Sequence, residues 1–195
     1  MNESRATLEL PLPLAKRLYT YDELVAELPE TNQPCELWDG EIIMSPAPTF
    51  DHQKIVSRLL RRLEDWVLPR KLGEVVAGPI DMVLSPHRAM QPDVAFIARE
   101  RLHIIDRVIK GPVDLAVEVV SLGNRNRDRI EKRDLYEQYG VKEYWIVDPE
   151  ARTVEVLHLE NARYRLLMRA SIGESFSSKL LPGLELSVNS VLFGE

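Results

Sequence analysis

Two acidic side chains and one lysine have the types and the spacing to form a divalent cation site. Asp93 closes a polar loop before an apolar run, and Glu118 lies inside the apolar run Val113–Val120. Burying an ionised carboxylate in a strand is costly unless a metal, a positive charge or hydrogen bonds compensate it. Two acids in neighbouring strands, with Lys132 in the helix that follows, therefore predict a site for a divalent cation.

The donor atoms of this site favour a hard cation. Carboxylate oxygens, with phosphate and water completing an octahedron, suit Mg²⁺ or Mn²⁺. No cluster of cysteine and histidine in the sequence has zinc spacing, so a structural zinc is not expected. The single cysteine, Cys35, leaves no intrachain disulfide and fits a cytoplasmic location, and no nearby histidine marks it as a nucleophile.

Lys132 belongs to a helix predicted over residues 126–139. A lysine there can hold an attacking water, stabilise a developing phosphorane or neutralise the acids. The alternative is a surface pair with Asp128, four residues earlier, which contributes a few tenths of a kcal/mol. By helical spacing, one face of this helix carries Asp128, Lys132, Leu135, Tyr136 and Tyr139.

His52 and Glu41 are further candidates for the same site. His52 comes three and four residues before Ile55 and Val56, on the apolar stripe of a predicted helix. It is therefore either a neutral core histidine that caps the helix or part of the edge of the site. Glu41 follows a tight turn, so it either joins the site or is merely exposed. Glu36, in the same hairpin, is expected to be exposed.

The predicted helices and strands fit best a mixed sheet with helices on both faces, of α/β (α+β) class, with a small extra β-hairpin region. We expect an N-terminal arm over 1–18 and a single domain over 19–195. Periodicity, caps and turn residues locate the elements. They are a helix from Thr20 to Pro29, a hairpin of Cys35–Trp38 and Glu41–Met44 around Asp39-Gly40, a helix from Thr49 or Asp51 to Leu68, a strand 73–84, a polar loop 85–91, a strand 94–98, a short helix 106–110, a central strand 113–121, the helix 126–139 ended by Gly140, a strand 143–147, a hairpin of 154–159 and 164–169, and a strand 184–188.

The composition limits the class of function. The chain has 195 residues and a net charge of −6, and no apolar stretch approaches the roughly 20 residues of a membrane span. The charge argues against a general nucleic-acid coating protein but not against a nuclease, because acids at a metal site lower the net charge. Two local basic clusters either contact phosphates or form solvated helix faces. They are Arg58, Arg61 and Arg62, and Arg125, Arg127, Arg129, Lys132 and Arg133.

Several segments of the chain resemble the PD-(D/E)xK nuclease superfamily, in particular its bacterial branch of restriction endonuclease-like proteins. In order they are YTYDEL (19–24), CELWDGEIIMSPAPTFDHQ (35–53), QPDVAFIA (91–98), VDLAVEVVS (113–121), RDRIEKRDLYEQYGVKEYWIVDP (127–149) and LPGLEL (181–186). Together they cover nearly the whole chain. The resemblance implies a restriction-endonuclease-like mixed sheet flanked by helices, Mg²⁺-dependent hydrolysis of phosphodiester bonds in DNA, and a homodimer.

The resemblance also implies roles for the candidate residues. Asp93 and Glu118 match the metal-binding acids. In the parent motif a lysine stands two residues after the second acid, and here that position is Val120. The branch supplies the lysine from the following helix, which matches Lys132. The positions that complete the site in this branch are matched by His52 and Glu41.

Three functions from different classes are compatible with the sequence. The first is a metal-dependent DNA endonuclease that uses Asp93, Glu118 and Lys132. The second is a catalytically weak nucleic-acid-binding or regulatory module that retains the nuclease fold. The third is a structural protein in which the acids and the lysine form a buried ion network. One departure from the branch, Ser121-Leu122-Gly123-Asn124 in place of a Ser-Pro-Ser/Thr-type turn, predicts altered substrate handling.

Overall fold

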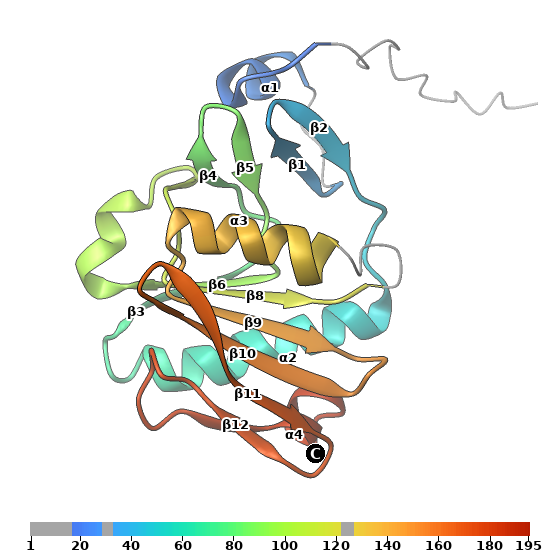
Figure 1. The fold of residues 1–195 in the computed structure, drawn as a ribbon, viewed down its shortest axis with the longest axis vertical. Helices are drawn as coiled ribbons and strands as arrows, with labels where there is room; N and C mark the ends of the chain where they lie inside the picture. The colour runs from blue at the N-terminus through green and yellow to red at the C-terminus, as the bar shows by residue number, and fades with distance from the viewer. Residues whose placement is uncertain (1–16, 29–32, 122–126) are drawn as a thin grey trace, which may run out of the picture.

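Helices cover both faces of a six-stranded sheet, which we call the larger sheet; the described residues also form a five-stranded sheet, which we call the smaller sheet, and a two-stranded one. The computed structural model describes residues 17–28, 33–121 and 127–195. In that part of the chain, α2 (Phe50–Val67) packs on one face of a six-stranded sheet and α3 (Lys132–Tyr139) lies on the other (Figure 1). A five-stranded sheet, with α1 (Tyr21–Glu27) beside it, forms the upper part of the molecule in this view. The predicted mixed α/β architecture is confirmed.

The larger sheet has the predicted apolar strand at its centre. Its order is β11-β10-β9-β8-β6-β3, and β8 runs parallel to β9 and antiparallel to β6. Val94 pairs with Val117, which sets Asp93 opposite Glu118. The strands are β3 (Gly73–Ala77), β6 (Val94–Ala98), β8 (Leu115–Val119), β9 (Glu143–Asp148), β10 (Thr153–Glu160) and β11 (Arg163–Ser171).

The central strand alternates between two hydrophobic cores. Leu115, Val117 and Val119 pack with the buried face of α2. Ala116 packs with residues of α3, so Glu118 also points towards α3, as the alternation of side chains in a strand predicts. Tyr144 and Trp145 of β9 are fully buried in these cores, so they stabilise the sheet and offer no surface for a dimer contact.

The smaller sheet holds the predicted hairpin of β1 (Cys35–Trp38) and β2 (Glu41–Met44). Asp39 and Gly40 between them have φ of 49° and 86°, the left-handed values that a tight hairpin turn requires. The sheet order is β2-β1-β5-β4-β7. Its remaining strands are β4 (Met82–Ser85), β5 (Arg88–Met90) and β7 (Ile109–Lys110).

Three sequence predictions in this region are wrong. The expected strand 73–84 is two strands in different sheets, because Gly78-Pro79 interrupts it and proline has no N–H for a ladder. The expected polar loop 85–91 contains β5, which is held by pairing with β1 and β4. The expected helix 106–110 ends in β7, and the helical turn lies earlier, as the 3₁₀ helix Arg99–Ile104.

The helices follow their local signals. Thr20 and Glu23 form a capping box at α1, and Thr49 caps α2 by accepting a hydrogen bond from the His52 N–H. A π-helical turn, Arg127–Glu131, leads into α3, and Gly140 at φ 82° ends it as predicted.

The C-terminal region differs in part from expectation. The closing region consists of β12 (Ser175–Ser177), β13 (Glu185–Ser187) and a short helix that was not predicted, α4 (Val188–Leu192). The predicted arm up to residue 16, the expected helix end at Pro29, residue 126 and the turn residues 122–124 lie outside the described residues. Among the described helices, none combines the length and apolar character that a membrane crossing requires.

Asp114, the other acid of the central apolar run, anchors the far end of β8. Its carboxylate is fully buried, accepts a hydrogen bond from the Ala98 N–H at 2.8 Å, and lies 3.1 Å from Arg101 and 2.7 Å from Lys142. Burial by itself would raise the pKa of Asp114, but the hydrogen bonds from Lys142, Ala98 and Arg101 outweigh it and hold that pKa below its ordinary value of 3.8.

We expect Asp114→Asn to lower the free energy of unfolding at neutral pH. We also expect the free energy of unfolding of the variant to fall less steeply than that of the wild type as the pH is lowered. Because the folded pKa lies below the unfolded one, the stabilisation is present above the unfolded value and is lost as pH falls through the folded value. Urea unfolding of the variant and the wild type between about pH 7 and pH 3 measures whether the unfolding free energies of the two proteins converge at low pH. Asp65→Asn, at an exposed side chain, is the matched control, and an equal deficit for Asp114→Asn at every pH would contradict the prediction.

Candidate active site

A cavity of about 740 Å³ opens where β8 and β9 end, beside the first turn of α2. The structure brings four of the five predicted site residues to its wall: His52, Asp93, Glu118 and Lys132. Four further acids that were not expected there line it as well, and two of them, Glu36 and Asp148, are buried.

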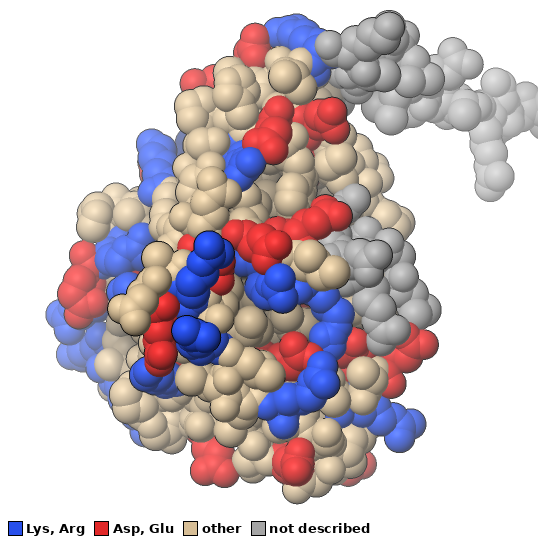
Figure 2. Space-filling model, in the orientation of Figure 1, with Lys and Arg blue, Asp and Glu red and all other residues tan. Residues whose placement is uncertain are grey.

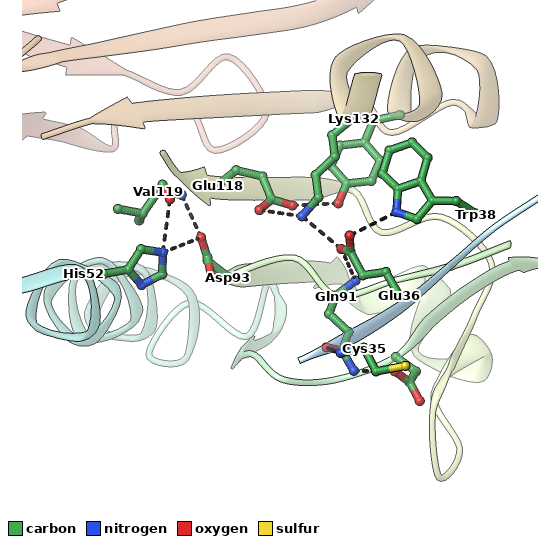
Figure 3. A network of polar contacts seen from close by, with 11 residues as sticks. Cys35, Glu36, Trp38, His52, Gln91, Asp93, Glu118, Val119 and Lys132 are labelled. Carbon is green, nitrogen blue, oxygen red and sulfur yellow. Dashed lines mark hydrogen bonds and ion pairs between the residues drawn. The ribbon is translucent and has the colours of Figure 1, made fainter. Parts of the chain in front are cut away.

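Asp93 and His52 are fixed to the end of the central strand (Figure 3). The Val119 N–H donates to Asp93 Oδ2 at 2.7 Å. His52 Nε2 lies 3.0 Å from the Val119 carbonyl oxygen and 3.3 Å from Asp93 Oδ2. Both of these oxygens are acceptors, so we assign the hydrogen of the ring to Nε2. The geometry thus places His52 at the edge of the site rather than in the interior of the core.

Glu118 and Lys132 form a buried ion pair. Glu118 is 3% exposed and Lys132 is 6% exposed, and Lys132 Nζ donates to Glu118 Oε2 at 3.0 Å. The Tyr136 hydroxyl donates to the other oxygen of Glu118 at 2.7 Å. Burial, followed by the charges of Glu118 and Glu36, raises the pKa of Tyr136 well above its ordinary value, so this hydroxyl stays protonated as a donor.

Glu36 is the site residue that the sequence analysis missed. Predicted to be exposed, it is 6% exposed, and its Oε1 lies 2.9 Å from Lys132 Nζ. It also accepts hydrogen bonds from the Trp38 indole at 3.1 Å and from the Gln91 N–H at 3.0 Å. The ammonium of Lys132 therefore lies between two carboxylates (Figure 3). No local signal separates Glu36 from Glu41, because each is the one acid of a four-residue strand of the same hairpin.

Glu41 does not join the site. It is exposed at the start of β2, opposite Trp38, and is not among the residues that line the cavity. The hairpin thus contributes an acid to the site, but from its first strand. Asp128 was expected on the same helix face as Lys132, but its side chain is outside the part of the protein that the structure describes.

Asp148 places a third strand end at the cavity. Its side chain is 2% exposed, accepts a hydrogen bond from the Ala151 N–H at 2.8 Å, and lies 3.7 Å from Arg129. Arg129 also contacts Glu155 at 2.9 Å. These contacts fix the turn after β9 and the π-helical turn before Lys132 relative to each other.

The donor set fits a hydrated hard cation. In the described residues, no group of three histidine, cysteine or acidic side chains is arranged to hold a metal ion. A zinc site of three or four protein ligands therefore does not fit. Mg²⁺ usually keeps several waters and takes one or two carboxylates, which Asp93 and Glu118 can supply.

Comparisons with known proteins agree with this fold. The model of the Uma2 family, described as "Putative restriction endonuclease", matches residues 21–189, so this chain belongs to that family. Five solved chains match. One is the crystal structure of "a putative nuclease belonging to DUF820" from Anabaena variabilis ATCC 29413, with a TM-score of 0.74 and 20% identity over 89% of this chain and 97% of that chain. The expected restriction endonuclease-like superfamily is confirmed, and a comparison with curated proteins gave no match.

We expect Glu36→Gln to cost roughly 1–3 kcal/mol of unfolding free energy, because it weakens buried, charge-assisted hydrogen bonds to Lys132 and Trp38. Glu41→Gln is the matched control from the same hairpin and should change stability by less than about 0.5 kcal/mol, since Glu41 is exposed. Urea unfolding of both variants measures the difference. A larger loss for Glu41→Gln would contradict the assignment of Glu36 as the buried partner of Lys132.

Proposed function

We propose that this chain is a metal-dependent endonuclease that hydrolyses phosphodiester bonds of DNA. The observation that carries the proposal is the convergence of Asp93 and Glu118, from neighbouring strands, with Lys132 in one cavity. Membership of a family described as "Putative restriction endonuclease" and the fold shared with a structure described as "a putative nuclease" support it. The expected homodimer and the cytoplasmic location belong to the proposal, and they rest on the resemblance and on the single cysteine.

In this proposal Asp93 and Glu118 hold Mg²⁺ or Mn²⁺. When bound, such an ion polarises a phosphate and lowers the pKa of a water molecule. The Val119 N–H and His52 keep the Asp93 carboxylate oriented. Lys132, held by Glu118 and Glu36, orients the attacking water and offsets charge that develops on the phosphate. Glu36 positions Lys132 and need not touch the substrate.

A nucleic-acid-binding module with weak cleavage is the second candidate. The observation that favours it is the burial of Lys132 between two carboxylates, which compensates its charge within the protein. Because Glu36 and Glu118 offset the charge of the ammonium, Lys132 attracts a phosphate less strongly. DNA binding could then occur with little cleavage, so the two must be measured separately.

Cleavage of DNA by Lys132→Ala tests the proposal. We expect the wild type to cleave supercoiled, linear or single-stranded DNA with Mg²⁺ or Mn²⁺, and the variant to lose at least about 100-fold in rate. Lys110→Ala, at an exposed lysine of β7, is the matched control and should cleave as the wild type does. Cleavage by Lys132→Ala at the wild-type rate would remove the lysine from the mechanism. If the wild type and the two variants bind DNA but none of them cleaves it, the result would favour the second candidate.

Metal binding predicts a stability change that does not depend on activity. If Mg²⁺ binds the folded protein alone, its addition stabilises the wild type by about 2.7 kcal/mol at a concentration of 100 times the dissociation constant. We expect Asp93→Asn and Glu118→Gln to lose this increment, whereas Glu74→Gln, at an exposed acid of β3, retains it. Thermal unfolding with and without Mg²⁺ provides the measurement. An undiminished Mg²⁺ effect in both site variants would place the cation elsewhere.

A further inference from the structure

The solvent side of α2 carries a run of positive charge on a chain whose net charge is −6. Between Lys54 and Arg62 the helix has four basic residues and no acidic residue. Acids flank this run at Asp51 and Glu64, so the positive charge is confined to about two turns. The buried residues of α2 face the larger sheet, and by helical spacing the basic residues lie on the opposite side.

One of these basic residues has a structural partner. The Arg58 guanidinium donates to the carbonyl oxygens of Val191 and Leu192 at the end of α4. It thereby satisfies carbonyl groups that a helix end leaves without a partner in its own helix. Arg58 therefore ties α2 to α4. The remaining three residues, Lys54, Arg61 and Arg62, are exposed, and we call them the α2 basic face.

Fewer ion pairs with acidic side chains compensate the positive charges of the α2 basic face than those on the opposite side of the larger sheet. Within the described residues, Lys54 and Arg62 make no ion pair, and Arg61 reaches Asp65 only at 3.9 Å. On the opposite side of the larger sheet, by contrast, basic and acidic side chains are interspersed (Figure 2). Arg163 there pairs with Glu137 at 2.8 Å. The α2 basic face is thus a surface whose positive charge remains available to a polyanion.

This surface begins at the cavity. His52 and Gln53 of the first turn of α2 line the cavity, and Lys54 follows directly. From Lys54 to Arg62 the helix rises about 12 Å. Over that length one strand of B-DNA presents about three or four phosphates, spaced about 3.4 Å apart along the axis. The length of the basic run is therefore sufficient to contact more than one phosphate of a duplex that extends along the helix from the site.

We propose that the α2 basic face binds the phosphate backbone of duplex DNA that enters the cavity at the first turn of α2. The inference rests on the proposed function, because it takes the cavity as the place where that DNA is cleaved. Lys54, Arg61 and Arg62 contact phosphates and so fix the direction of the duplex, whereas sequence preference, if the protein has one, arises from other surfaces.

The test is the salt dependence of DNA binding by the full chain. Binding of a fluorescent duplex is measured between about 50 and 200 mM salt for the wild type and for the triple variant Lys54→Gln, Arg61→Gln and Arg62→Gln. We expect binding at least about tenfold weaker and a salt slope smaller by about one unit for each residue changed. The matched control removes the same charge at exposed residues elsewhere, Lys110→Gln, Arg163→Gln and Arg165→Gln, and should retain the wild-type slope.

Each outcome decides the inference, and most separate it from the proposed function. A slope reduced by the α2 variant alone supports the inference, even if the wild type cleaves no DNA and the proposed function fails. Equal slopes for the wild type and the α2 variant, in a protein that cleaves DNA, overturn the inference and leave the proposed function standing. No salt-dependent binding of duplex DNA by the wild type also overturns it. Loss of binding to phosphatidylserine vesicles, with DNA binding unchanged, would reassign the surface to lipid and overturn it as well.

Discussion

The ammonium of Lys132 between two carboxylates is the interaction on which the candidate site depends. Its Nζ lies 2.9 Å from Glu36 and 3.0 Å from Glu118 in a buried position. A buried ammonium without partners costs several kcal/mol, so the three segments that carry these groups must stay together. The interaction joins the first strand of the hairpin, the central strand of the larger sheet and the helix that covers it.

Hydrogen bonds extend this constraint from Glu36 of the smaller sheet to α1. The Gln91 N–H donates to Glu36, and the Gln91 side chain donates to Asp81 at 2.8 Å. Asp81 in turn accepts from the Tyr21 hydroxyl of α1 at 2.6 Å. A continuous chain of contacts thus runs from the cavity to the first described helix. The smaller sheet therefore supports the site, although the sequence predicted only a small extra β-hairpin region.

The distribution of charge reconciles a net charge of −6 with the DNA substrate that we propose. The cavity at the first turn of α2 concentrates carboxylates, and the α2 basic face, which follows along the same helix, concentrates positive charge. The ammonium of Lys132 offsets part of the charge of Glu36 and Glu118, whereas the exposed lysine and arginines of the α2 basic face act directly at the surface. The local arrangement of charge, rather than its sum, is what bears on DNA binding.

Local signals in the sequence determined the hairpin at Asp39-Gly40, the amphipathic helix that carries His52, and the acids Asp93 and Glu118 next to a central strand. Turn geometry, periodicity and the cost of burying a charge act over a few residues, so they can be read from the sequence. Only the tertiary structure decided between the two acids of the hairpin. Glu36 and Glu41 stand in equally short strands, and the one that is buried is the one that meets Lys132, a residue distant in sequence. Likewise β5 and β7 exist because other strands pair with them, and such long-range pairing leaves no local signal.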